Sequence, residues 1–328
     1  MNKIKEKGIP DLLLKAFSFF IILFILDFSI GSILRYLYFK QTSGLLYRTT
    51  YSIDSTRAEF LIFGSSTANH HYDTRLFEKR LGNSVYNTGR DGSMFFYNYA
   101  IFKSVLKRFH PKTAILDFNT EELKFSEESY DRISALLPYY KNHPEIRSVV
   151  ELESPYEKYK LLSKIYPFNS LLFTIAIGNT NFNKKRELVD DENGYIPLTH
   201  VWNRKIATQA SLNYELDSNK VNILKSLIKE CKDSSVQLYI CISPRFVKYT
   251  GKDISVDTTR EIAKEFNVPF YDFSNDTLFW DHREYFADES HLNETGAEIF
   301  SNAVLGDILQ HQNQITANAP HNSSSETN

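Results

Sequence analysis

The sequence predicts an α/β fold in which a parallel, doubly wound sheet carries helices between its strands. Short apolar runs bounded by turn residues alternate along the chain with longer segments whose apolar residues recur every three or four positions. This alternation of strands with helices is typical of a parallel sheet. The 328 residues, 42% hydrophobic and 24% charged, have the composition of one large globular domain with attachments.

Five segments have the form of buried strands. The first is an apolar run that ends at Gly64, and the fourth is bounded by Ser243 and Pro244. The predicted strands are Ala58–Phe63, Ser84–Asn87, Thr113–Phe118, Val236–Ile242 and Pro269–Phe273.

Helices are predicted between these strands. After the second strand, apolar residues are spaced by four and three: Phe95, Tyr99, Phe102, Leu106 and Phe109. This spacing puts one apolar stripe toward the sheet, and Pro111 ends the helix. The other predicted helices are Asn219–Lys232, Thr258–Phe266 and a closing helix from about Glu294 to Leu309.

Residues 1–40 have the form of a short cytoplasmic tip followed by a transmembrane anchor. The net basic start, Met1–Lys7, precedes an apolar run from Ala16 to Leu34 that only Asp27 interrupts. A central Asp costs roughly 2.5–3.5 kcal/mol on insertion scales, and the Leu, Ile and Phe residues of the run together return roughly 4–8 kcal/mol. We therefore expect the run to enter a membrane.

An uncleaved anchor is favoured over its rival, a cleaved signal peptide. No small-x-small cleavage site follows the run, and Arg35, Tyr36 and Tyr38 resemble an interfacial border. The basic tip predicts a cytoplasmic N-terminus and an extracytoplasmic main domain. Two interpretations stay open for Asp27: pairing with the membrane helix of a partner, or a tolerated polar residue.

Three further segments flank or interrupt the α/β domain, which we assign to residues 57–310. Residues 40–56 are predicted to be a polar connector. Residues from about 121 to 217 are helical in pattern and rich in Tyr, so we expect an insertion that caps the strand ends and shapes a substrate site, or else an oligomer contact. Residues 311–328, rich in Asn, Ser, Gln and Thr, are predicted to be a disordered tail.

Charge and cysteine content argue against two classes of function. The formal net charge is −2, so no basic field favours nucleic acid as a partner. Only Cys231 and Cys241 occur, and Cys241 lies inside an apolar run, where it is expected to be a small buried hydrophobe without a disulfide, metal or redox role.

The first segment with chemical potential is Gly64-Ser65-Ser66, directly after the first predicted strand. Ligands of open α/β sheets bind at the carboxyl ends of the strands, so a serine at this point is exposed and rigidly held. A helix start beyond it leaves backbone N–H groups available to an anion. Taken alone, this pattern is also that of a plain turn.

The second segment is Asp288-Glu-Ser-His291, just before the closing helix. Asp and His three residues apart can lie on one turn, where the carboxylate holds Nδ1–H of the imidazole and Nε2 points outward as a base. With nine His and forty acidic residues in the chain, this spacing also arises by chance.

Together, the two segments give the chain a layout that resembles the SGNH/GDSL hydrolase family. The family's first block, Gly-Asp-Ser, stands here as Gly64-Ser65-Ser66, so the nucleophile position falls on Ser66. Its last block resembles residues 286–293, and the resemblance implies that His291 is the general base and Asp288 its orienting partner. The fold it implies is a flavodoxin-like three-layer α/β sandwich.

The resemblance also implies donors to an oxyanion. In the family, a glycine N–H of the second block contributes, and Gly92 is the best match, with Gly89 second. The third block, Gly-x-Asn-Asp, has its counterpart in Asn119, which stands about two positions early and lacks the flanking glycine. Because of this departure, the resemblance leaves open whether Asn119 completes the oxyanion hole.

Other polar residues give weaker signals of a functional site. His70 and His71 have no acidic or cysteine ligand at a recognisable spacing, so we predict no metal and no cofactor. Arg245, after the fourth strand, is interpreted as a surface charge rather than a contact to an anionic substrate.

The resemblance implies acyl transfer through a covalent serine ester. Water as acceptor makes an esterase, and a sugar hydroxyl makes an O-acyltransferase. Membrane-anchored members that serve D-alanyl transfer to teichoic acid or alginate acetylation work beside a membrane-bound O-acyltransferase, so we expect an acyl-ester or envelope-polysaccharide substrate. The alternative is a non-catalytic envelope protein that keeps the fold for binding or assembly.

Overall fold

The computed structural model describes residues 4–180, 193–205, 207–210 and 214–318. The chain divides into two compact units. Unit 1 comprises Met1–Asp54 and Glu127–Val189, and unit 2 comprises Ser55–Ser126 and Asp190–Asn328. The expected insertion is therefore divided, since its larger part belongs with the N-terminal helix and the remainder with the α/β unit.

Unit 2 contains the predicted five-stranded parallel sheet, in the order β2-β1-β3-β5-β7. This is the flavodoxin-like order, in which the chain reverses direction across the sheet beside β1. The four residues of β1 and the six of β3 are all buried, as expected of strands covered on both faces. The strands are β1 (Phe60–Phe63), β2 (Val85–Asn87), β3 (Thr113–Phe118), β5 (Gln237–Ile242) and β7 (Phe270–Asp272).

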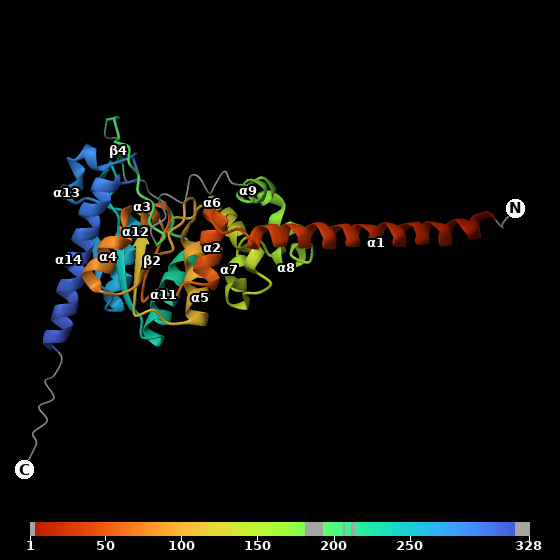
Figure 1. The fold of residues 1–328 in the computed structure, drawn as a ribbon, viewed down its shortest axis with the longest axis horizontal. Coiled ribbons are helices and arrows are strands. Elements are labelled where there is room, and N and C mark those ends of the chain that lie inside the picture. The colour runs from red at the N-terminus through yellow and green to blue at the C-terminus, as the bar shows by residue number, and fades with distance from the viewer. Residues whose placement is uncertain (1–3, 181–192, 206, 211–213, 319–328) are drawn as a thin grey trace, which may run out of the picture. The chain divides into compact units, whose positions relative to one another are not determined.

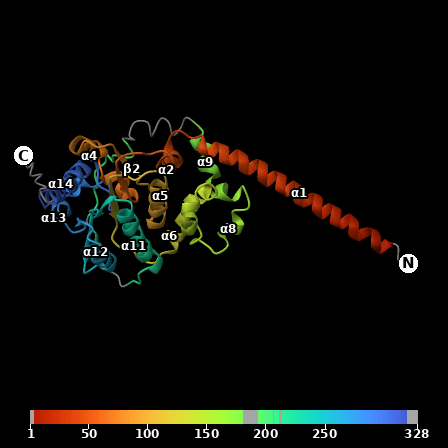
Figure 2. The same ribbon diagram turned by 90° about the horizontal axis from the view of Figure 1, so that it is seen from below.

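Helices cover both faces of this sheet and complete the three-layer sandwich. On one face α14 packs against α3 and α4, and on the other α5 packs against α11. Figure 2 shows α4 and α14 on one side and α11 and α12 on the other. The helices of unit 2 are α3 (Ser66–His71), α4 (Thr74–Leu81), α5 (Phe95–Arg108), α11 (Ser218–Asp233), α12 (Ile254–Glu265), α13 (Thr277–Trp280), the 3₁₀ turn η4 (Arg283–Tyr285) and α14 (Glu294–Asn318).

Three details of unit 2 differ from expectation. Helix α12 begins four residues early, because Asp253 caps it by accepting the N–H groups of Ser255 and Val256. Helix α14 runs on to Asn318, so residues 311–318 of the expected tail are helical, and 319–328 lie outside the described residues. A helix that has already nucleated extends readily through a segment without Gly or Pro. A parallel pair, β4 (Ala207–Ala210) with β6 (Val247–Thr250), was not predicted.

Unit 1 is helical. Helix α2 (Gly44–Asp54) replaces the predicted polar connector, because Leu46, Thr49 and Ile53 recur at helical spacing and are buried. The remaining elements are α1 (Ile4–Phe39), α6 (Glu127–Asp131), η1 (Arg132–Tyr139), η2 (Pro144–Ile146), α7 (Arg147–Val150), α8 (Glu157–Lys160), η3 (Tyr166–Leu171) and α9 (Leu172–Gly178).

Helix α1 is long and apolar enough, from Gly8 to Phe39, to cross a membrane. Its C-terminal part contacts η3 and α9 of the same unit. In Figure 1 the rest of α1, drawn in red, extends beyond the other helices of unit 1. The carboxylate of Asp27 has partners within the chain, which neither interpretation included: it accepts hydrogen bonds from the Ser163 hydroxyl and the backbone N–H groups of Lys164 and Ile165.

Candidate active site

The loop between β1 and α3 presents the predicted nucleophile. A Cβ at Gly64 would lie 2.6 Å from Cβ of Ala68 and 2.8 Å from Cβ of Asp117, so only glycine lets this turn approach the end of β3. Ser66 is the first residue of α3 and is half-buried. Its backbone N–H, as in any first helical turn, has no partner within the helix.

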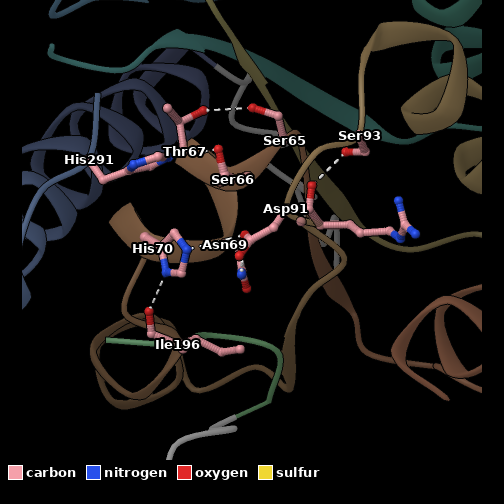
Figure 3. A network of polar contacts seen from close by, with 12 residues as sticks. Ser65, Ser66, Thr67, Asn69, His70, Asp91, Ser93, Ile196 and His291 are labelled. Atoms are coloured by element: carbon pink, nitrogen blue, oxygen red, sulfur yellow. Dashed lines mark hydrogen bonds and ion pairs between the residues drawn. The ribbon is translucent and has the colours of Figure 1, made fainter. Parts of the chain in front are cut away.

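Three predicted residues form one hydrogen-bonded chain. Ser66 Oγ lies 2.7 Å from Nε2 of His291, and Nδ1 of His291 lies 2.9 Å from both carboxylate oxygens of Asp288. Figure 3 shows Ser66 and His291 facing one another across the site. The contact expected of a nucleophile, a base and an orienting carboxylate is therefore present, although Ser66 and His291 are 225 positions apart in sequence.

The surroundings of Asp288 keep it ionised. Burial alone raises its pKa, but hydrogen bonds from the imidazole of His291 and from the backbone N–H groups of Ser290 and His291, with the charge of His291, lower the pKa to about 2. An ionised Asp288 holds the proton of His291 on Nδ1, which leaves the Nε2 lone pair directed at the Ser66 hydroxyl.

Asn119 lies beside the nucleophile loop, as the resemblance implied. Its side-chain Nδ2 donates to Ser65 Oγ at 3.0 Å and to Glu122 Oε2 at 3.1 Å, and its Oδ1 lies 3.2 Å from the Thr67 hydroxyl. Both N–H groups of the amide are thus engaged in this state. For Asn119 to bind an oxyanion, one of these two hydrogen bonds has to be exchanged.

The loop that carries Gly92 is tied to the nucleophile loop on both sides. Before Gly92, Asp91 accepts from the amide of Asn69 at 2.8 Å, and after it Ser93 Oγ lies 3.5 Å from the carbonyl of Gly64. Gly92 has a φ of 67°, a left-handed conformation that favours glycine. By contrast, the N–H of Gly89 donates to Asn87 at 2.9 Å, which makes Gly92 the better donor of the two.

A second histidine lies next to the triad. Nδ1 of His70 donates to the carbonyl of Ile196 at 2.7 Å, and its Nε2 lies 3.2 Å from Asp91. The ring meets that of His291 edge to face at 5.3 Å (Figure 3). Sequence reasoning missed Asn69, Asp91 and Ile196, because these contacts join segments with no shared motif.

His71 is buried behind the base. Burial lowers its pKa well below the ordinary value, and the neighbouring His291 and His70 lower it further. The ring is therefore neutral, and Nε2 accepts the N–H of Leu292 at 3.0 Å. This hydrogen bond fixes α3 to the residue that follows His291, so His71 holds the backbone beside His291 in place.

A buried carboxyl group lies under the nucleophile loop. Asp117, at 2% exposure near the end of β3, accepts hydrogen bonds from Thr67, Tyr72 and Ser243. Burial raises its pKa to about 6 against the lowering effect of these three hydroxyl donors. Its one signal in the sequence is an Asp inside an otherwise apolar strand, which was interpreted only as part of that strand.

Arg245 is not the exposed surface charge that was expected. Its side chain is partly buried, and its guanidinium donates to the Ser290 hydroxyl at 2.8 Å and lies 3.5 Å from the Thr120 hydroxyl. It therefore joins the loop of Asn119 to the turn between Asp288 and His291. A fixed guanidinium at this point adds a positive charge close to the triad.

The described part of the chain contains no group of three His, Cys, Asp or Glu side chains arranged to hold a metal ion. Cys231 and Cys241 are free and buried, and burial raises the pKa of both thiols, so neither is an activated nucleophile. No protein-family model and no curated protein matches this sequence, and a function has to be argued from the geometry of the site.

Proposed function

We propose that the protein is a serine esterase or O-acyltransferase of the SGNH type, held by α1 in a membrane with its α/β unit outside the cytoplasm. The observation that carries the proposal is the hydrogen-bonded chain of Ser66, His291 and Asp288. The spacing of 2.7 Å between Ser66 Oγ and His291 Nε2 lies within the reach that proton transfer requires.

The proposed reaction has two half-reactions. Ser66 Oγ attacks the carbonyl carbon of an ester while Nε2 of His291 takes the hydroxyl proton, and the leaving alkoxide receives that proton as the ester bond breaks. An acceptor hydroxyl, from water or a sugar, then gives its proton to His291 and attacks the acyl group on Ser66. His291 returns this proton to Ser66 Oγ as the bond between the acyl group and Ser66 breaks. Asp288 remains ionised throughout and stabilises the imidazolium in both steps.

The tetrahedral oxyanion of each step needs donors. The N–H of Ser66 at the start of α3 and the N–H of Gly92 have no hydrogen-bond partner among the described residues, and we assign them this role. Asn119 joins them when its amide turns away from Ser65 or Glu122. Removing one donor of this kind typically costs about 10²–10³ in kcat.

The membrane placement rests on α1. Asp27, Arg35 and Tyr38 of this helix contact the insertion, and Tyr38 is 1% exposed. Cleavage near residue 35 would remove Asp27 and its hydrogen bonds from unit 1, which favours an uncleaved anchor over a signal peptide. The basic tip predicts that the N-terminus is cytoplasmic. An envelope polysaccharide as acceptor, and a membrane-bound O-acyltransferase as partner, are proposed from the family resemblance.

A fluorophosphonate probe tests the proposal on the full chain in detergent. The probe should label the wild type, and Ser66→Ala should abolish the labelling. Ser65→Ala is the matched control, because it removes only the contacts to Asn119 and Thr67 and leaves the Ser66–His291 hydrogen bond. Absence of both labelling and aryl-ester turnover in a folded wild type would favour the non-catalytic binding protein instead.

A further inference from the structure

Unit 1 contains a cavity of about 540 Å³ beside the C-terminal part of α1. One wall is formed by α1 itself at Gly31, Ser32 and Arg35, and the others by two segments of the insertion, 137–147 and 158–168. Gly31 is required for this contact, because a Cβ there would lie 2.4 Å from the backbone of Lys164. The active-site residues all belong to unit 2 and line no part of this cavity.

The lining of the cavity is cationic. Among the described residues that line it there is no Asp or Glu, and the five basic side chains are Arg35, Lys141, Arg147, Lys158 and Lys164.

None of these five lies within ion-pair distance of a carboxylate among the residues that the structure describes. Arg35 and Arg147 donate to backbone carbonyls, and Lys164 lies over the ring of Phe28. Lys164 has Asp27 as an acidic neighbour, and the charges of the two groups interact. The other four basic side chains have no carboxylate within ion-pair distance among the described residues, and such cations around one cavity favour an anionic ligand with several acceptor oxygens.

The same cavity has an apolar side. Leu137, Leu161 and Phe168 line it, and so does Leu162, which is 80% exposed. A ligand that fills the cavity therefore combines an anionic group with apolar chains.

The position of the cavity along α1 matches the depth of lipid headgroups. From Ile9 to Leu26 the helix rises about 26 Å, close to the roughly 30 Å thickness of a bilayer core. The insertion contacts α1 at Asp27, so we place the end of the bilayer core there rather than at the border expected near Arg35, with the Asp11–Lys15 ion pair near the opposite end of the stretch. Gly31 and Arg35 then lie about 6 and 12 Å beyond Asp27 along the helix, at headgroup level.

Exposed apolar side chains of the insertion support the same placement. Tyr156, Tyr159 and Phe173 are 66%, 61% and 77% exposed. Phe173 belongs to α9, which contacts α1, and the two tyrosines flank Lys158 of the cavity lining. Figures 1 and 2 show α9 beside the base of the red helix. Exposed Tyr at the end of a membrane span is typical of an interfacial belt.

We propose that this cavity binds the headgroup phosphate of an anionic phospholipid from the bilayer that α1 enters. The five basic side chains hold the phosphate, and the acyl chains lie along Leu161, Leu162 and the exposed face of α1. This site rests on the membrane placement of α1 and is independent of the chemistry at Ser66. It also fixes the insertion to the membrane surface at a second point besides the anchor.

Lipid retention by the full chain tests the site. The protein is purified in detergent, incubated with mixed micelles of equal parts phosphatidylglycerol and phosphatidylcholine, and the bound lipids are counted by native mass spectrometry. The wild type should retain phosphatidylglycerol preferentially. Lys141→Gln with Lys158→Gln, both at exposed side chains, should weaken this preference by about fivefold for each charge removed.

Two further variants keep the test decisive. Lys141→Arg with Lys158→Arg should preserve phosphatidylglycerol binding, and Lys225→Gln with Lys229→Gln, on exposed positions of α11, should leave it unchanged. The proposal is overturned if the wild type shows no lipid preference, or if the Gln pair at 141 and 158 behaves as the wild type. Displacement of the lipid by soluble glycerol phosphate at equal concentration would also overturn it in favour of a water-soluble ligand. Fluorophosphonate labelling of the same samples reports separately on Ser66.

Discussion

Replacing Asp117 with asparagine should remove a pH-dependent contribution to the stability of the α/β unit. The carboxyl group is buried with three hydroxyl donors, and its pKa of about 6 lies above the ordinary value of 3.8. The folded state therefore binds this proton more tightly than the unfolded chain. The stabilisation is fully present below pH 3.8 and is lost as the pH rises through 6.

The size of this effect follows from the shift in pKa. A difference of about 2 units corresponds to about 3 kcal/mol of unfolding free energy. The amide in Asp117→Asn would keep an oxygen for Tyr72 and Ser243, while the Thr67 hydroxyl can donate to Asn119, which it already faces at 3.2 Å. The substitution thus removes the titration with little change in shape.

Denaturant unfolding followed by tryptophan fluorescence measures the effect, because both tryptophans, Trp202 and Trp280, belong to unit 2. The unfolding free energy of the wild type minus that of Asp117→Asn should fall by about 3 kcal/mol between pH 3.8 and neutrality. Asp281→Asn, at an exposed position, is the control. A difference that stays constant or increases with pH would refute the reasoning.

Three more predictions concern the site, the turn and the membrane. Asp288→Asn retains an oxygen for its backbone donors, but its amide no longer holds the proton of His291 on Nδ1 as the carboxylate does. Aryl-ester turnover should therefore fall by up to about 10⁴-fold with an unchanged circular dichroism spectrum, and a loss below about tenfold would contradict this. Gly64→Ala should destabilise unit 2 by about 1–3 kcal/mol through overpacking. Gly306→Ala lies within α14, where the new Cβ would meet no neighbouring atom within 4 Å, and should stabilise the unit by about 0.5–1 kcal/mol; equal melting temperatures of the two variants would contradict both expectations. Washed membranes should retain the protein, with a tag after Asn328 open to protease from outside the cytoplasm, and a soluble species starting near residue 35 would show cleavage instead.

The sheet could be predicted because its strands carry their own signal. Residues such as Phe60–Phe63 are buried on both faces, so they are apolar throughout and end at turn residues. Helix α2 was missed because its apolar stripe is narrow and interspersed with Ser, Thr and Tyr, and only packing within unit 1 reveals it. The pairing of β4 with β6 joins segments about 40 residues apart, which no local pattern indicates.

The candidate site likewise has residues that could be predicted from the sequence and contacts that could not. Ser66 follows a strand, and Asp288 and His291 share one turn, so each half has a local signature. The surrounding contacts depend on tertiary structure. Asp91 meets His70 and Asn69 only because the loop after β2 lies beside α3, and Arg245 meets Ser290 only because the ends of β5 and the last loop converge. The same reasoning applies to Asp117, whose hydroxyl donors come from two separate segments, Thr67 and Tyr72 from α3 and its C-cap and Ser243 from the end of β5.

The central claim is that Ser66 forms a covalent acyl ester, and acid-quenched peptide mapping tests it most directly. The full chain is mixed with p-nitrophenyl acetate, quenched in acid during the first turnover, digested, and examined by tandem mass spectrometry. We predict one acetyl group on Ser66 in the wild type and in Ser65→Ala, and none in Ser66→Ala. An acetyl group on Ser65 or Ser93, or release of p-nitrophenol with no acetylated serine, would contradict the assignment.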